Sequence, residues 1–177
     1  MVGFMGSDRQ EKMFELDNEI SGILTKIEKM LEEWHCELNK SCDYDEKFGY
    51  NGIITVFNPV IDRNLSIDIT KTEDYSVISM YFADWHSHCE FNNISDVIDT
   101  IRNLVTNEFG SAQVYLGEEH RRSIASGIIR HDAENNPNAE CLGLPKSYNE
   151  HWLKNSAEME IKFWDPKYDK TITIESR

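Results

Sequence analysis

The residues best suited to chemistry lie in one short segment, Asp84 to Glu90, with the sequence DWHSHCE. In an extended chain His86 and His88 lie on the same side, because side chains alternate between the two faces of a strand. Two imidazoles at that spacing can hold zinc or another transition metal, with an acid at either end of the segment as a third ligand. A catalytic zinc site needs about three protein ligands. The pair supplies two, so a metal site requires a further ligand.

The same segment also fits a surface that binds another protein. Tryptophan beside charged groups is typical of interface anchors, which favours Trp85 in that role. A plainer alternative is a strand end whose side chains pack and hydrogen-bond at the rim of a sheet. The candidates for partner binding in this segment are Asp84, Trp85, His86, His88 and Glu90, and the metal alternative rests on the two histidines.

A second candidate surface is acidic. The 177 residues carry 32 acidic and 18 basic side chains, a formal net charge of −14. Such a field repels nucleic-acid phosphates and anionic membranes, so neither is expected as a partner, whereas it attracts a basic protein. Plain solubility is the alternative explanation of the charge. Acids are dense at Glu32, Glu33, Asp43 and Asp45, which we expect to form an acidic patch.

Motifs of the common enzyme classes are absent from the sequence. It has no G-x-S-x-G, no P-loop and no G-x-G-x-x-G, and its four cysteines form no C-x-x-C pair. No secretion signal is recognisable, and no apolar run approaches the roughly 18 residues of a membrane span. We therefore expect no cofactor, reduced thiols and a cytoplasmic location, and an enzymatic role is disfavoured.

The elements that would position these residues begin with a long amphipathic helix over residues 8–39. Its apolar residues recur at alternating spacings of three and four, at Leu16, Ile20, Ile23, Ile27, Met30 and Trp34. We expect this stripe to pack on the protein's own sheet. The alternative is a short coiled-coil seam that joins two copies in a homodimer.

The rest of the chain alternates short strand patterns with one further helix. Closely spaced strands that suggest an antiparallel meander are expected at 53–57, 65–69 and 77–82, followed by a helix at 94–109, a strand at 112–116 and a hairpin over 159–174. Residues 131–157 are expected to form a long loop with one short helix near 148–153. The sum is a single α+β domain over residues 1–177: a mainly antiparallel sheet of about six or seven strands, the long N-terminal helix and one inserted amphipathic helix.

The stretch from Ser79 to Phe91, with the helix and strand expected after it, resembles small bacterial immunity proteins of contact-dependent or polymorphic toxin systems. In those proteins a strand ends in an aromatic-His-x-His-aromatic or acidic segment before a helix and another strand. The resemblance covers residues 76–117, and Cys89 stands where the pattern usually has an aromatic residue.

This resemblance implies a non-enzymatic inhibitor that occludes a cognate toxin domain, and an acidic chain suits capture of a basic toxin. The alternatives are a small metal-dependent hydrolase that uses His86 and His88, and a structural or oligomeric module.

Overall fold

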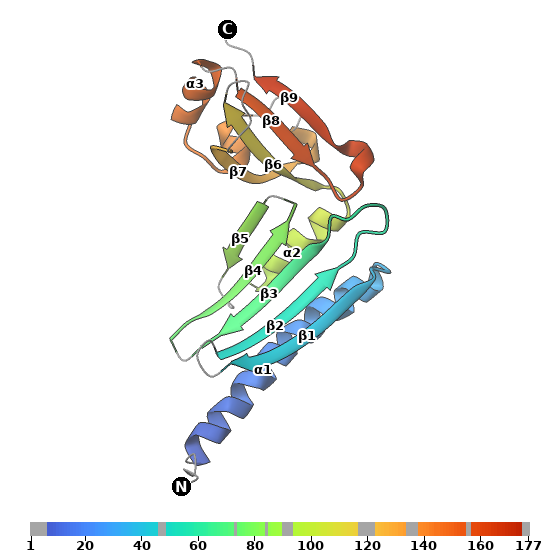
Figure 1. Ribbon diagram of the computed structural model, residues 1–177, viewed down its shortest axis with the longest axis vertical. Coiled ribbons are helices and arrows are strands. Elements are labelled where there is room, and N and C mark those ends of the chain that lie inside the picture. The colour runs from blue at the N-terminus through green and yellow to red at the C-terminus, as the bar shows by residue number, and fades with distance from the viewer. Residues whose placement is uncertain are drawn as a thin grey trace. The chain divides into compact units, whose positions relative to one another are not determined.

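The computed structural model describes residues 7–45, 49–72, 74–83, 85–89, 94–116, 123–133, 138–154 and 157–174. These residues form α-helices and two antiparallel sheets, which confirms the α+β class (Figure 1). The expected single sheet of about six or seven strands is wrong. One sheet has five strands in the order β1-β2-β3-β4-β5, and the other has four in the order β7-β6-β8-β9.

The chain divides into two compact units that interleave along the sequence. The first contains Met1–Phe57, Leu65–Met80 and His88–Ile98, and the second contains Asn58–Asn64, Tyr81–Ser87 and Asp99–Arg177. That one domain spans residues 1–177 stays a prediction, and each unit is described by itself below.

The five-stranded sheet follows the chain in order. Its strands are β1 (Leu38–Asp45), β2 (Gly49–Val56), β3 (Leu65–Lys71), β4 (Ser76–Phe82) and β5 (Trp85–Cys89). β2 pairs antiparallel with both β1 and β3, as expected for the start of a meander. Buried residues alternate along β2 and β3, including Ile54, Val56, Leu65, Ile67 and Ile69, so one face of these strands forms the core of the first unit.

Helix α1 (Ser7–Glu33) lies along this sheet and contacts β2 and β3 (Figure 1). Its apolar stripe from Ile20 to Leu31 is buried within the chain. Gly52 of β2 permits the close approach, because a Cβ there would lie 2.9 Å from Leu24 Cδ1. The packing of the helix on its own sheet is therefore confirmed. Because the stripe from Ile20 to Leu31 is buried, these residues leave no exposed apolar seam through which α1 could pair with a second copy. The homodimer itself stays a prediction.

The helix ends six residues before its expected limit at residue 39. His35 takes a left-handed backbone (φ 56°), which stops the helix. The amide of His35 donates to Glu32 O (3.0 Å) and the amide of Cys36 donates to Leu31 O (3.1 Å), the paired bonds of a Schellman motif. Leu38 continues the helical spacing in the sequence but begins β1 opposite Val56.

The four-stranded sheet lies in the second unit. Its strands are β6 (Phe109–Leu116), β7 (Ala125–Arg130), β8 (Ala157–Lys162) and β9 (Lys170–Ile174), all paired antiparallel. The C-terminal hairpin predicted from alternation is confirmed as β8 and β9. One face packs in a core that includes Val114, Ile129, Met159, Ile161 and Phe163.

Short helices complete the described fold. Helix α2 (Ile94–Val105) buries Val97, Ile101 and Leu104, and it is shorter than the expected 94–109 because β6 begins at Phe109. Within residues 131–157 the structure has 3₁₀ turns η2 (His131–Ala133) and η3 (Ala139–Leu142) and helix α3 (Ser147–Lys154). Helix α3 confirms the predicted short helix, and its Trp152 lies in the core of the second unit. No helix in the described part of the chain is long and apolar enough to cross a membrane.

Candidate functional site

The histidine segment forms β5, with Trp85 inside and both histidines outside. His86 and His88 are exposed, which confirms that they share a face, but the side chain of Trp85 is only 7% exposed. The alternation that turns the histidines outward turns Trp85 inward. The expectation of an exposed tryptophan anchor is therefore wrong for this residue. Asp84 and Glu90 lie outside the described residues.

Each histidine of β5 has a neighbour on β4. The ring of His86 stacks on the exposed ring of Tyr81, with centroids 6.2 Å apart and planes inclined by 21°. Nδ1 of His88 lies 2.8 Å from the hydroxyl of the buried Ser79, a hydrogen bond whose direction depends on the tautomer. Among the described residues no group of three or more metal-binding side chains occurs. The histidines therefore have structural contacts, and the described part of the chain gives the metal alternative no third ligand.

The C-terminal end of α1 carries an exposed group of acids. Glu32 and Glu33 lie in its last turn, which holds no basic residue, and Glu37 follows the Schellman turn. The C-terminal end of a helix is the negative pole of its dipole, where a carboxylate typically costs about 0.3–1 kcal/mol. Glu32 and Glu33 therefore occupy positions that helix stability does not favour.

The expected acidic patch does not form as one surface. Asp43 and Asp45 lie toward the far end of β1, and their side chains are outside the description. At about 3.3 Å per residue, the strand carries them roughly 17 to 23 Å from Leu38, next to which the exposed Glu37 lies. Glu32, Glu33 and Glu37 are thus a separate group, which we call the α1 acidic end.

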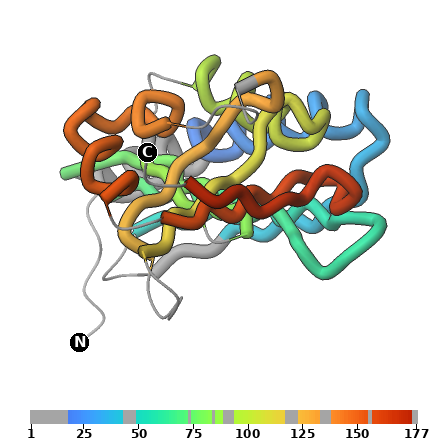
Figure 2. Tube along the Cα trace, turned by 90° about the horizontal axis from the view of Figure 1, so that it is seen from above, coloured from blue at the N-terminus to red at the C-terminus, as the bar shows by residue number. Residues whose placement is uncertain are grey.

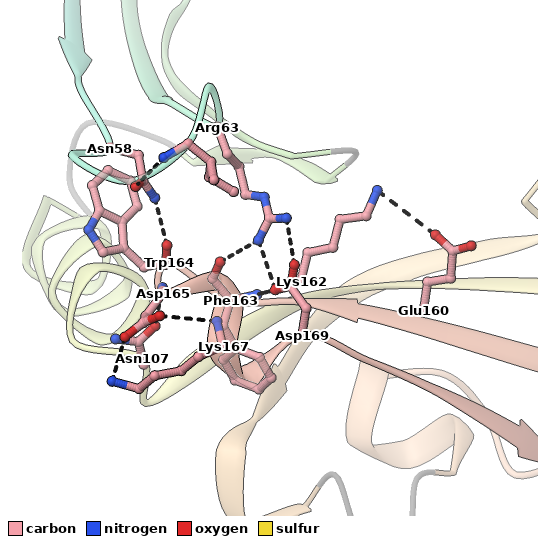
Figure 3. Close-up of polar contacts among 11 residues, drawn as sticks. Asn58, Arg63, Asn107, Glu160, Lys162, Phe163, Trp164, Asp165, Lys167 and Asp169 are labelled. Atoms are coloured by element: carbon pink, nitrogen blue, oxygen red, sulfur yellow. Dashed lines mark hydrogen bonds and ion pairs between the residues drawn. The ribbon is translucent and has the colours of Figure 1, made fainter.

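A polar cluster that the sequence did not reveal fixes the connection between β8 and β9 (Figure 3). The guanidinium of Arg63 grips both carboxylate oxygens of Asp169, with Nη1–Oδ1 2.8 Å and Nη2–Oδ2 2.6 Å, and donates to Phe163 O at 2.6 Å. Asp169 Oδ1 also accepts the amide of Phe163 at 2.8 Å. Arg63 and Asp169 are half-buried, so we call this set the Arg63 clamp.

Two asparagines extend the clamp. Asn58 Nδ2 donates to Trp164 O at 2.6 Å, and Asn107 Oδ1 accepts the amide of Asp165 at 2.6 Å. Figures 1 and 2 both show the loop over residues 58–64 beside the turn between β8 and β9. Turn-type residues marked both loops in the sequence, but no local signal pairs residues more than 100 positions apart. The cluster orders backbone and offers no reactive group.

Two further features of the described residues are a small hollow and the thiol of Cys36. A hollow of about 160 Å³ lies between α1 and β1, lined by Ser21, Leu24, Lys40, Ser41 and Cys42. The ammonium of Lys40 pairs with Glu28. Burial raises the pKa of the Cys36 thiol and disfavours the reactive thiolate. Neither feature brings together the groups that a catalytic site needs.

No protein-family model, curated protein or solved structure matches this chain.

Proposed function

We propose that the protein is a non-enzymatic immunity protein that acts in the cytoplasm and occludes a basic toxin domain. The observation that supports this most directly is the α1 acidic end. Two exposed carboxylates, Glu32 and Glu33, lie where the helix dipole disfavours them, and the exposed Glu37 follows them, on a chain with a net charge of −14. Local departures from the preferences of a helix are expected at functional sites.

The mechanism is electrostatic capture followed by steric occlusion. Clustered surface charge raises the rate of association with an oppositely charged protein. This rate enhancement becomes smaller as added salt screens the charges. A toxin that acts on nucleic acid carries basic side chains to bind phosphates, and these are the groups that Glu32, Glu33 and Glu37 attract. The exposed pair of Tyr81 and His86 is a second contact candidate, in place of the buried Trp85.

The test uses the toxin domain that the proposal expects to be encoded beside this chain's gene, purified as an inactive variant. We expect a one-to-one complex whose association rate falls with added salt, and growth protection when chain and active toxin are co-expressed. Glu32→Gln with Glu33→Gln should lower the association rate by about tenfold, because two attracting charges are lost. The same variant should gain about 0.5–1 kcal/mol in free energy of unfolding, because the helix end loses repulsion.

The matched control is Glu140→Gln with Glu150→Gln, which removes two exposed acids of the second unit and changes the net charge equally. We expect it to change the association rate by no more than about twofold. Equal losses in the two variants would show that total charge, and not the α1 acidic end, governs binding. Absence of any complex and of protection would make the proposal wrong.

A further inference from the structure

Asn51 and Gly52 form the one Asn-Gly pair in the sequence, and this pair lies inside strand β2. Asn-Gly is typical of tight turns, and both residue types are depleted in strands. Packing explains the glycine, because a Cβ at position 52 would lie 2.9 Å from Leu24 Cδ1 and 3.0 Å from Ile20 Cγ2 of α1. The described contacts give the half-buried Asn51 no comparable reason, since its Oδ1 lies 3.5 Å from Thr70 Oγ1, at the outer limit of a hydrogen bond.

An asparagine that precedes glycine is chemically labile. The backbone nitrogen of the glycine attacks Cγ of the asparagine, and the glycine has no side chain to hinder the approach. A bond forms between that nitrogen and Cγ, the bond from Cγ to Nδ2 breaks, and Nδ2 leaves as ammonia with the proton of the glycine amide. Water then opens the cyclic imide at either of its two carbonyl carbons, which gives aspartate or isoaspartate. Water is the co-reactant, and nothing is oxidised or reduced.

Pairing on both sides of β2 protects the two residues from this reaction. Asn51 and Gly52 are each paired with β1 on one side and with β3 on the other. The ring closes only when the backbone between them rotates, because an extended strand keeps Cγ of the asparagine out of the plane of the imide. Gly52 is also buried beside α1. The reaction therefore requires β2 to separate from its neighbours.

We propose that Asn51 is a modification site, which deamidates to aspartate and isoaspartate through attack by Gly52 whenever the first unit opens locally around β2. Local opening occurs continually in folded proteins, at a frequency set by the stability of the segment. Because deamidation is irreversible, modified chains accumulate, and their fraction records how long β2 has been open. This modification does not depend on toxin binding.

The modification makes a second opening easier than the first. In the register, position 51 lies opposite Asp43 of β1, and Asp68 of β3 lies opposite Ile53, the next residue on the same face of β2. A new carboxylate at position 51 therefore adds to the acids of this part of the sheet, and like charges at facing positions destabilise antiparallel strands. Isoaspartate disrupts the strand further, because an extra carbon enters the main chain and shifts the register of every residue beyond it.

The experiment incubates the full chain at mildly alkaline pH, in native buffer and in concentrated urea, and follows residue 51 by peptide mass spectrometry. We expect the reaction in urea to be at least about a hundredfold faster than in native buffer, because the open state of a folded segment is a small fraction. Asn64 is the control within the same chain, since the side chain of Leu65 hinders attack on it. Asn51→Ser should abolish the signal.

Two core variants test whether the opening belongs to the first unit. Leu24→Ala removes a buried contact of α1 and should raise the native rate at least about tenfold. Met159→Ala, a similar truncation in the core of the second unit, should change the rate by no more than about twofold. Circular dichroism verifies folding. Should Leu24→Ala unfold, Ile20→Val and Ile161→Val replace the pair, with an expected rise of at least about twofold for the first and no change for the second.

A last pair of variants tests the effect of the product. Asn51→Asp should lower the urea midpoint of unfolding more than Asn39→Asp, which makes the same change of charge at an exposed position opposite Thr55. Equal midpoints would contradict the acid-rich environment of position 51.

Three outcomes overturn the proposal: an Asn51 that stays intact in urea, equal rates in native buffer and urea, or equal acceleration by the variants of the two units. None of these outcomes bears on the toxin complex, which is measured separately.

Discussion

Replacing Arg63 with methionine should destabilise the second unit, because the Arg63 clamp loses its centre. The substitution removes three hydrogen bonds, two to the Asp169 carboxylate and one to Phe163 O. Methionine keeps most of the aliphatic length of arginine, so the stability that is lost comes chiefly from the polar contacts. What remains is a half-buried carboxylate without its cation.

The size of the effect follows from burial. Breaking a fully buried ion pair costs about 3–5 kcal/mol, whereas exposed pairs contribute about 0–1 kcal/mol. The side chain of Arg63 is 13% exposed and that of Asp169 is 30% exposed, so water reaches the carboxylate in part. We therefore expect a loss of about 2–3 kcal/mol in the free energy of unfolding. Lysine at position 63 should recover less than half of it, because it lacks the planar fork.

Urea unfolding of a double-mutant cycle measures the interaction itself. Arg63→Met, Asp169→Asn and the double variant should give a coupling energy of about 1.5 kcal/mol or more. Arg130→Met is the matched control, because Arg130 and Asp132 also form a two-bond pair but are 69% and 70% exposed. That control should cost no more than about 0.5 kcal/mol. Coupling below about 0.5 kcal/mol for Arg63 and Asp169 would refute the reasoning, because it would place the clamp among ordinary surface pairs.

Two further predictions concern packing and pH. Gly52→Ala should cost about 1–3 kcal/mol, the usual range for overpacking, because the added Cβ would lie 2.9 Å from Leu24 Cδ1; thermal unfolding measures it, and an unchanged midpoint would contradict the close packing of α1 on β2. The ammonium of Lys167, and then its amide, lower the pKa of Asp165 below the usual 3.8. Since the folded pKa is the lower one, the stabilisation is present at neutral pH and is lost as pH falls through that pKa. A carbon-13 titration should show this shift, and Lys167→Met should move the pKa back toward 3.8; a carboxyl that titrates at its usual value in the unchanged chain would contradict the contact.

The sequence predicted elements with strong periodicity and missed those that depend on distant partners. The stripe from Ile20 to Leu31 and the alternation in β8 and β9 are local patterns, and both the helix and the hairpin form, although the helix ends at Glu33 and not at residue 39. No strand was predicted over β1, whose residues are mostly polar. As an edge strand it needs pairing on one side only, and β2 supplies this with full register.

In the candidate site, too, the sequence revealed local patterns but not contacts between distant residues. The shared face of His86 and His88 followed from the two-residue period, and applying that period to Trp85 would have placed it on the opposite face. The Arg63 clamp had no such signal, because Arg63 and Asp169 are 106 positions apart in the sequence. The prediction extended the helix past Glu33 because no glycine, the usual marker of a helix end, stands there. The left-handed residue that ends the helix is His35.

The interleaving of the two units has a consequence for synthesis on the ribosome. The first unit contains no residue beyond Ile98, so all of its parts have emerged while the second still lacks its sheet. Making the chain from there to Asp169 takes roughly 4–14 s at the usual 5–20 residues per second. Throughout that interval Arg63 has been synthesised but Asp169 has not. The loop over residues 58–64 therefore cannot form the Arg63 clamp until the end of the chain is made. A stop codon between Ile98 and Asp169 would leave the first unit whole in sequence and the second without its clamp.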